Sequence, residues 1–177
     1  MSIQSYCIAL NGSSRPHGNT KALLNKISKT LGEPYVSGMP IVDLCTLNIT
    51  PYDYEGRNQK DDFIPLMERC IGEYSTIVIA TPIYWYTVSA YVKIFLDRIT
   101  DLMTIRRDLK KALEGTKISV IANFAGRNAD VIKMVEGHIN DLFSHLCDYL
   151  KMQYIGSYFI HMSVEQVDEK ALRPLFS

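Results

Sequence analysis

Short apolar runs alternate with amphipathic segments along this chain, and that alternation constrains its fold more than any other feature. The apolar runs cover residues 6–10, 41–44, 77–80, 118–122 and 154–160. Runs this short and this apolar are typical of strands that are buried on both faces of a sheet. Asp43 interrupts the second run, and the last run contains Gly156 and Ser157, which indicates an edge or mixed strand.

The segments between the runs place apolar residues at the spacing of one helix face. These residues are Leu23, Leu24, Ile27 and Leu31; Ile64, Met67 and Ile71; Val88, Tyr91, Val92, Phe95, Leu96, Ile99 and Leu102; and Val131, Val135, Ile139, Leu142, Leu146 and Leu150. Asn128 or Asp130 can cap the last helix, and Asp61 and Asp62 introduce the second as acidic first-turn residues. Four strand–helix repeats require right-handed crossovers and a parallel sheet covered on both faces. We therefore expect one α/β domain over residues 1–177, with three layers and about five strands.

The charge and hydropathy of the chain exclude several classes of protein. Lysine and arginine together number 19, as do aspartate and glutamate, so the formal net charge is zero. A chain without a basic field is not expected to bind nucleic acid mainly through counterion release. No apolar run approaches the roughly 20 residues that a membrane span needs, and the N-terminus lacks the pattern of a signal peptide. We expect a cytoplasmic protein that binds neither nucleic acid nor membranes.

The positions of cysteine and histidine do not suggest a metal centre. The four cysteines, at positions 7, 45, 70 and 147, are too far apart for the local spacing of a zinc or cluster site. His138, Asp141 and His145 share one side of a predicted helix, but they border its apolar stripe, where a solvated flank is expected. We predict no metal site, and we expect Cys7 and Cys147 to be buried.

The loop after the first strand has the composition of a phosphate-binding site. Residues 10–20 leave a buried strand and open an amphipathic helix, so they lie at the carboxyl edge of the sheet. A helix N-terminus offers unpaired N–H groups and the positive end of its dipole. The segment adds Gly12 and Gly18 and the donor side chains of Ser13, Ser14, Arg15, Asn19 and Thr20.

Three other interpretations compete with a phosphate site of this kind. A Walker A motif requires a lysine where this chain has Asn19, and it separates its glycines by four residues, whereas five separate Gly12 from Gly18. The dinucleotide fingerprint G-x-G-x-x-G is also absent. The third interpretation is an ordinary polar connection capped by Asn19. A monophosphate attached to a large organic body suits the loop better than the first two motifs.

The loop after the third predicted strand is stiff and aromatic. Residues 81–89 contain Pro82 and then Tyr84, Trp85 and Tyr86 in succession. Because three successive rings cannot all pack on one core face, at least one ring should be exposed, where a planar ligand could lie against it. The alternative is that these rings form a hydrophobic plug or an oligomer contact.

The expected strand order places the two loops beside each other. In the order 2-1-3-4-5, the first and third strands are neighbours whose connections diverge, and ligands bind at such a point. A mononucleotide with a flat ring system therefore fits between the two loops, with residues 123–127 as a third wall.

Taken together, these motifs resemble the flavodoxin-like NAD(P)H-dependent FMN reductase family, which includes quinone reductases, azoreductases and iron–sulfur flavoproteins. The resemblance is carried by Gly12-Ser13-Ser14-Arg15 with Gly18-Asn19-Thr20, and by Thr81-Pro82-Ile83-Tyr84-Trp85 followed by Lys93, Phe95, Leu96, Asp97 and Arg98. It extends from Ile3 to about Ile160. It implies a flavodoxin-like, doubly wound sandwich with FMN as the cofactor and NADH or NADPH as the co-substrate.

The resemblance also implies which residues bind FMN. They are Ser13, Ser14, Arg15, Gly18, Asn19 and Thr20 at the phosphate; Pro82, Ile83, Tyr84 and Trp85 along the isoalloxazine ring; and Asn123, Phe124, Ala125 and Gly126 on its other side. No catalytic side chain is expected, because the hydride chemistry belongs to the cofactor. The iron–sulfur members carry closely spaced cysteines after the second strand, where residues 51–57 of this chain have none, so no cluster is expected.

We therefore expect a homodimeric enzyme that passes a hydride from NAD(P)H through FMN to a small acceptor such as a quinone, an azo compound or a flavin. The alternatives are a flavodoxin-type electron carrier and a flavin-binding regulatory module. Flavodoxins are strongly acidic as a family, so the balanced charge of this chain favours the enzyme over the carrier. Residues 48–60 have no helix or strand pattern, and we expect Tyr52 and Tyr54 to shape the acceptor site together with Trp85.

Overall fold

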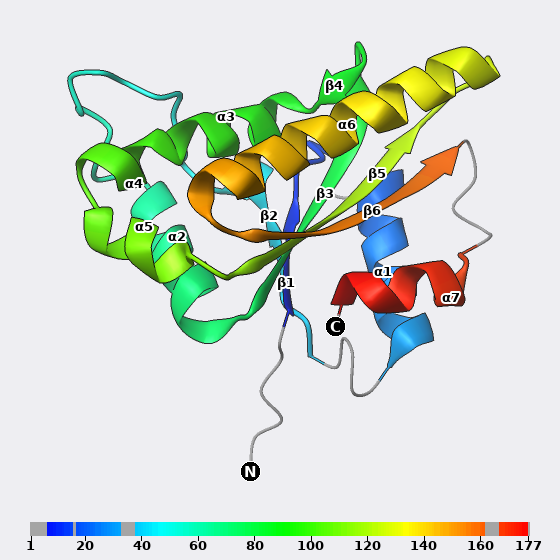
Figure 1. The fold of residues 1–177 in the computed structure, drawn as a ribbon, viewed down its shortest axis with the longest axis horizontal. Coiled ribbons are helices and arrows are strands. Elements are labelled where there is room, and N and C mark those ends of the chain that lie inside the picture. Colours follow the sequence, from blue (N-terminus) through cyan, green and yellow to red (C-terminus); the bar gives the residue numbers. More distant parts are fainter. Residues whose placement is uncertain (1–6, 16, 33–37, 162–166, 177) are drawn as a thin grey trace.

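The computed structural model describes residues 7–15, 17–32, 38–161 and 167–176, and its centre is a parallel sheet with helices on both faces (Figure 1). The parallel strands are β1 (Cys7–Asn11), β2 (Ile41–Asp43), β3 (Thr76–Tyr84), β5 (Lys117–Phe124) and β6 (Gln153–His161). They lie in the order β2-β1-β3-β5-β6, which is the predicted order once the short antiparallel strand β4 (Thr87–Val88) is left out of the count. The predicted α/β class is confirmed, and β6 is an edge strand.

Helices pack on both faces of this sheet. They are α1 (Asn19–Leu31), α2 (Phe63–Glu73), α3 (Ala90–Arg98), α4 (Thr100–Thr104), α5 (Arg107–Leu113), α6 (Ala129–Leu150) and α7 (Glu169–Leu172). Figure 1 shows α1 and α7 on one face and α2, α3 and α6 on the other. Successive residues of β1 therefore enter opposite cores, with Ile8 and Leu10 in one and Cys7 and Ala9 in the other. Burial on both faces explains why the strand sequences are apolar without alternation.

Three helices begin at positions that differ from the sequence-based expectation. Asp61 and Asp62 precede α2 instead of lying in its first turn, because Asp62 is the N-cap and the first turn contains no acidic residue. Gly18 rather than Asn19 precedes α1 as its N-cap, and Asn19 is the first helical residue. The stripe expected to form one long helix is divided into α3 and α4, and α3 begins only at Ala90. Its start is fixed by Ser89, whose hydroxyl oxygen accepts a hydrogen bond from the amide of Val92. Capping by a side chain thus decides where the helical pattern begins.

Strand β3 continues beyond its predicted end and turns into a hairpin. The sequence predicts a loop over residues 81–89, but β3 pairs there with β4 and places Ile83 opposite Val88. Both side chains are buried, which explains why the chain remains extended past the apolar run of β3. Trp85 and Tyr86 form the two-residue turn between the strands.

Among the described residues, no helix is both long enough and apolar enough to cross a bilayer. Cys7 and Cys147 are buried, as predicted, and burial raises the pKa of the Cys7 thiol to about 11. His138, Asp141 and His145 are exposed on α6. The described part of the chain assembles no group of three or more side chains that could hold a metal ion.

Candidate functional site

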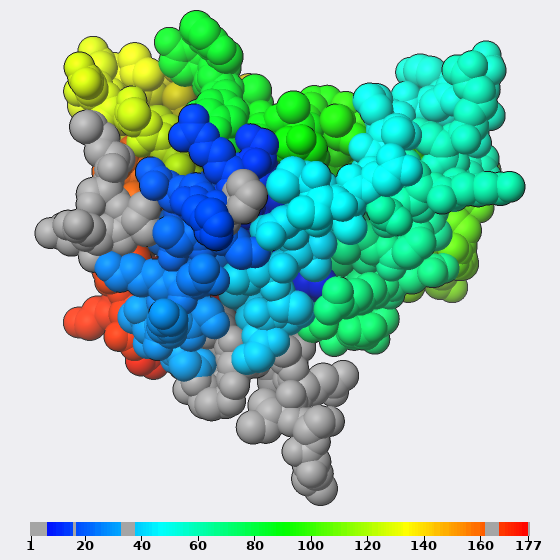
Figure 2. Space-filling model, turned by 180° about the vertical axis from the view of Figure 1, so that it is seen from behind, coloured from blue at the N-terminus to red at the C-terminus, as the bar shows by residue number. Residues whose placement is uncertain are grey.

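Two adjoining cavities lie at the carboxyl edge of the sheet, where the segments after β1, β3 and β5 meet. In Figure 2 the hairpin (green) and the start of α6 (yellow) lie close to the segment after β1 (blue). The first cavity has a volume of about 510 Å³, within the range of about 300–1,000 Å³ that is typical of small-molecule sites. Its lining residues are Ser13, Arg15, His17, Gly18, Asn19, Thr20, Pro82, Ile83, Tyr84, Asn123, Phe124, Ala125 and Ile160. All of these except His17 and Ile160 are residues that the sequence predicts for the site.

The second cavity has a volume of about 540 Å³ and shares Ile83, Tyr84, Phe124 and Ala125 with the first. The remaining lining residues are Trp85, Tyr86, Gly126, Arg127, Asn128, Val131 and Val135. Ser14 is exposed and lines neither cavity, although the sequence predicts it in the site.

Sequence reasoning missed part of the second cavity because those residues have another structural signal. Val131 and Val135 belong to the apolar stripe that predicts the core face of α6. Asn128 is the predicted cap of that helix, and its side chain does accept hydrogen bonds from the amides of Asp130 and Val131. Helix-forming and cavity-lining roles therefore coincide at the start of α6.

Gly12, directly after β1, lies against the middle of β3. Its amide donates a 2.7 Å hydrogen bond to the carbonyl oxygen of Ala80, and the Ser89 hydroxyl donates one of 2.7 Å to the Gly12 carbonyl oxygen. A Cβ atom at Gly12 would lie 2.3 Å from Val92 Cγ2 and 2.8 Å from Ser89 Oγ. Because no side chain fits there, glycine is required for this close approach.

The segment after β1 folds into a turn that leaves the N-terminus of α1 open. The Ser13 amide donates to Asn11 Oδ1 at 3.1 Å, the Arg15 amide donates to Ser13 Oγ at 3.2 Å, and the Gly18 amide donates to the Arg15 carbonyl oxygen at 3.0 Å. The N-cap of α1 is Gly18, which has no side chain that could cap the helix, and the first turn contains no acidic residue. The unpaired N–H groups of a helix N-terminus attract an anion, so this end of the first cavity suits a phosphate.

Side chains from three strands fix the same end of the cavity. The buried Thr20 donates from Oγ1 to Asn123 Oδ1 at 2.7 Å, which joins the start of α1 to the end of β5. Asp43, at the end of β2, accepts hydrogen bonds of 2.8 Å from both Asn11 Nδ2 and Lys21 Nζ. The ion pair with Asp43 compensates the charge of Lys21. Among the described residues that line the first cavity, Arg15 is the one lysine or arginine side chain that can meet an anion.

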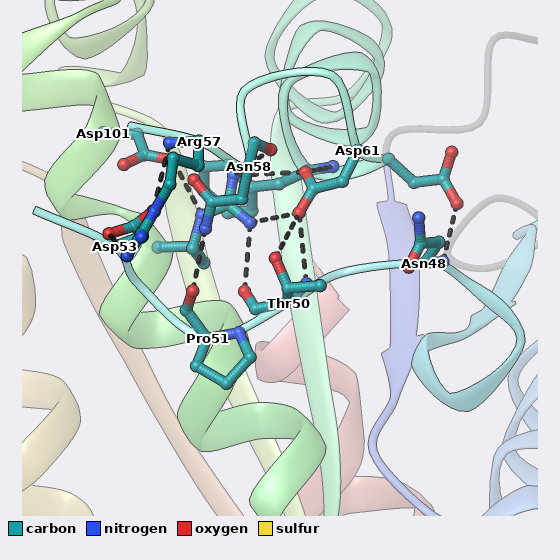
Figure 3. A network of polar contacts seen from close by, with 11 residues as sticks. Asn48, Thr50, Pro51, Asp53, Arg57, Asn58, Asp61 and Asp101 are labelled. Atoms are coloured by element: carbon teal, nitrogen blue, oxygen red, sulfur yellow. Dashed lines mark hydrogen bonds and ion pairs between the residues drawn. The ribbon is translucent and has the colours of Figure 1, made fainter. Parts of the chain in front are cut away.

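Residues 48–60 are held against the protein by the buried guanidinium group of Arg98. Figure 3 shows the network of polar contacts that includes Thr50, Asn58 and Asp61. The Arg98 guanidinium forms ion pairs with Asp61 and with Asp101, where Nε lies 2.7 Å from Oδ2. It also donates from Nη1 to the Thr50 carbonyl oxygen at 3.0 Å and from Nη2 to that of Asn58 at 3.4 Å. The patternless segment is thus an ordered loop with a charged anchor.

The structure places Tyr52 and Tyr54 of this loop outside the linings of the first and second cavities, and their expected role at the acceptor site stays a prediction. Tyr52 and Tyr54 line a separate cavity of about 150 Å³, together with Asp101 and Ile105 among others, and it shares no lining residue with the first or second cavity. Their rings contact each other at a centroid distance of 4.9 Å. The loop is anchored by the buried Arg98, and no local sequence pattern reveals such a contact.

Comparison with known proteins agrees with this architecture. Residues 6–166 match the family described as NADPH-dependent FMN reductase. YwqN of Bacillus subtilis, assigned as an NAD(P)H-dependent FMN-containing oxidoreductase, is 27% identical over 151 residues, which cover 83% of this chain and 80% of YwqN.

Solved structures show the same fold. The Trp repressor binding protein of Bacillus subtilis has a TM-score of 0.65 at 21% identity, covering 89% of this chain and 85% of that one. An FMN-dependent NADH-azoreductase from Bacillus anthracis, solved in complex with FMN, has a TM-score of 0.57 at 11% identity, covering 96% and 93%. The family match extends over most of the chain, and its residues include every segment that lines the two cavities. This chain belongs to the NADPH-dependent FMN reductase family, and it is an NAD(P)H-dependent oxidoreductase with FMN as its cofactor.

Proposed function

We propose that the first cavity binds FMN without a covalent bond and that the enzyme passes two electrons from NADH or NADPH to a small acceptor such as a quinone, an azo compound or a free flavin. The observation that carries this proposal is the open N-terminus of α1 at one end of the first cavity. An uncapped helix start beside Arg15 suits a phosphate, and the apolar walls of the same cavity suit a flat ring.

The roles proposed for individual residues follow from where they line the cavities. Ser13, Arg15, Gly18, Asn19 and Thr20 hold the phosphate. The isoalloxazine ring lies between two walls of the first cavity, which are formed by Pro82, Ile83 and Tyr84 on one side and by Asn123, Phe124 and Ala125 on the other. Trp85 and Gly126, which the sequence also predicts at the ring, line only the second cavity.

Bound FMN supplies the two-electron chemistry, so that NAD(P)H, one proton and a quinone yield NAD(P)⁺ and the hydroquinone. The side chains of this protein bind and orient the reactants and limit the access of water. The domain proposed for this task is the single unit formed by residues 1–177.

Anaerobic mixing of the FMN-loaded enzyme with NADH or NADPH in a stopped-flow spectrometer tests this function. We expect the flavin absorbance to bleach within milliseconds to seconds, because hydride transfer needs only a nicotinamide ring against the flavin. Addition of a quinone should then restore the absorbance. If neither nucleotide reduces the flavin over minutes, the proposal is wrong and the electron-carrier alternative is favoured.

We also propose that the enzyme is a homodimer with α3 at the interface. Tyr91 on α3 and the hairpin residues Tyr84 and Tyr86 are 39%, 50% and 54% exposed, and tyrosine is enriched at protein–protein interfaces. Lys93 and Asp97 form an exposed ion pair of 2.5 Å on the same helix. Sedimentation equilibrium is expected to give twice the mass of the chain, and a monomer at micromolar concentration would contradict the dimer.

A further inference from the structure

The second cavity adjoins the first through four shared residues, and its lining is mostly apolar and aromatic. Its shared wall consists of Ile83, Tyr84, Phe124 and Ala125, so a ligand in the second cavity lies directly beside whatever fills the first. Apolar and aromatic side chains form most of the remaining wall. Such a surface suits a flat aromatic ring rather than a sugar or a peptide.

Arg127 is the one charged side chain that lines the second cavity within the described part of the chain. It is exposed, and none of the ion pairs between described residues includes it. The described lining of the two cavities contains no carboxylate, and Arg15 and Arg127 are its only arginines. Each cavity therefore offers one uncompensated guanidinium group to an anion.

The hairpin turn above the second cavity is strained. Trp85 and Tyr86 have φ angles of 49° and 68°, in the left-handed region that two-residue hairpins of this kind usually fill with asparagine and glycine. Left-handed backbone costs a residue with a side chain about 1–2 kcal/mol, so large aromatic residues here need a reason. Trp85 is 92% exposed and gains little by burial, which leaves its ring free to contact a ligand.

We propose that the second cavity binds an aromatic electron acceptor that carries one anionic group, a sulfonate or a carboxylate, and that Arg127 selects for that group. This inference rests on the proposed function, because the acceptor takes two electrons from NAD(P)H by way of FMN and two protons to become the reduced, hydroquinone-type product. The ring lies against Trp85 and Phe124, and the anionic group meets the guanidinium of Arg127. One cation matches one anionic group, whereas a nicotinamide dinucleotide carries at least two phosphates.

Acceptor selectivity of the holoenzyme tests the role of Arg127. The probes are a naphthoquinone sulfonate and the uncharged quinone menadione, compared as the ratio of their kcat/KM values. Arg127→Gln is expected to lower the ratio of sulfonate to menadione about 10-fold, the effect of losing one charge-assisted hydrogen bond. Arg127→Lys should retain most of the preference. Arg107→Gln is the matched control, since Arg107 is an exposed arginine on α5 that lines none of the cavities, and it should leave the ratio unchanged.

A binding measurement gives a second readout that does not depend on turnover. Trp85 is the only tryptophan of the chain, so its fluorescence reports occupation of the second cavity in the oxidised holoenzyme. The naphthoquinone sulfonate should quench the Trp85 fluorescence of the wild type at a concentration about 10-fold lower than that needed for Arg127→Gln. Menadione should quench the fluorescence of the two proteins at the same concentration.

Two results would overturn the proposal. One is an equal change in kcat/KM for the sulfonate and for menadione in Arg127→Gln. The other is a changed rate of flavin reduction by NAD(P)H in Arg127→Gln, which would mean that Arg127 binds the nucleotide. Retention of FMN and its reduction by NAD(P)H are measured first in every variant. If the wild type fails at that step, the proposed function itself is wrong, whereas normal reduction with no change in selectivity refutes only the role of Arg127.

Discussion

Replacement of Arg98 by methionine is expected to lower the free energy of unfolding by about 3–5 kcal/mol, the cost of removing one partner from a buried ion pair. Asp61 and Asp101 would remain buried without their common cation. The loop over residues 48–60 would also lose its bonds from the guanidinium to the Thr50 and Asn58 carbonyl oxygens. Urea unfolding of the apoenzyme measures the effect.

Lys93→Met is the matched control for this substitution. Lys93 lies on the same helix and forms an exposed ion pair with Asp97, so its removal should cost less than about 1 kcal/mol. If the two variants lose the same free energy of unfolding, the buried ion pairs of Arg98 with Asp61 and Asp101 stabilise the protein no more than a surface ion pair does. Limited proteolysis should show faster cleavage within residues 48–60 in Arg98→Met only.

The pH dependence of the free energy of unfolding provides a second test of the buried ion pair between Arg98 and Asp61. Burial tends to raise the pKa of Asp61, but hydrogen bonds from Arg98 and from the amides of Phe63 and Thr50 lower it, and the pKa lies below its usual value. The folded protein therefore binds fewer protons than the unfolded chain, and Asp61 stabilises it above the ordinary aspartate pKa of about 4. That contribution is lost as the pH falls through the lowered pKa. In Arg98→Met the free energy of unfolding should no longer show this decrease at acid pH. If the variant and the wild type show the same pH dependence of stability, Arg98 does not lower the pKa of Asp61.

Replacement of Asn19 by aspartate is expected to weaken FMN binding about 100-fold, because a carboxylate at the phosphate end of the first cavity repels the anion at a cost of several kcal/mol. Asn19 is the exposed first residue of α1. An acidic residue at a helix N-terminus stabilises the helix by about 0.3–1 kcal/mol, so the apoenzyme should become slightly more stable. Opposite changes in stability and affinity separate a local charge effect from misfolding.

Asn25→Asp supplies the control for this variant. Asn25 is an exposed residue of the same helix that lines neither cavity, and its substitution changes the charge by the same amount. Fluorescence titration of each apoenzyme with FMN gives the dissociation constants. Equal affinities of wild type and Asn19→Asp would mean that the phosphate does not lie at α1.

The parts of the fold that the sequence predicts depend on local patterns. Short apolar runs identify strands, and the carboxyl ends of parallel strands share one edge, so the residues around Gly12 and Asn123 could be brought together without a structure. The contact between Thr20 and Asn123 across the first cavity agrees with that placement.

The hairpin and the anchored loop depend on contacts that no local pattern contains. Two-residue hairpins are usually marked by asparagine and glycine, and here Trp85 and Tyr86 occupy the turn, so the sequence indicates only an aromatic loop. Asp61 looks like a first-turn acid of α2, whereas its carboxylate is bound by Arg98, which lies 37 positions further along the chain. A long-range ion pair of this kind becomes visible only in three dimensions.

The most direct test of the central claim compares FMN with riboflavin, which lacks only the phosphate. If the phosphate lies at residues 13–20, the wild-type apoenzyme should bind FMN at least about 100-fold more tightly than riboflavin, since each hydrogen bond to the charged group contributes about 1.5–3 kcal/mol. In Asn19→Asp the two affinities should become nearly equal. Equal affinities of the wild-type apoenzyme for FMN and riboflavin would contradict the account.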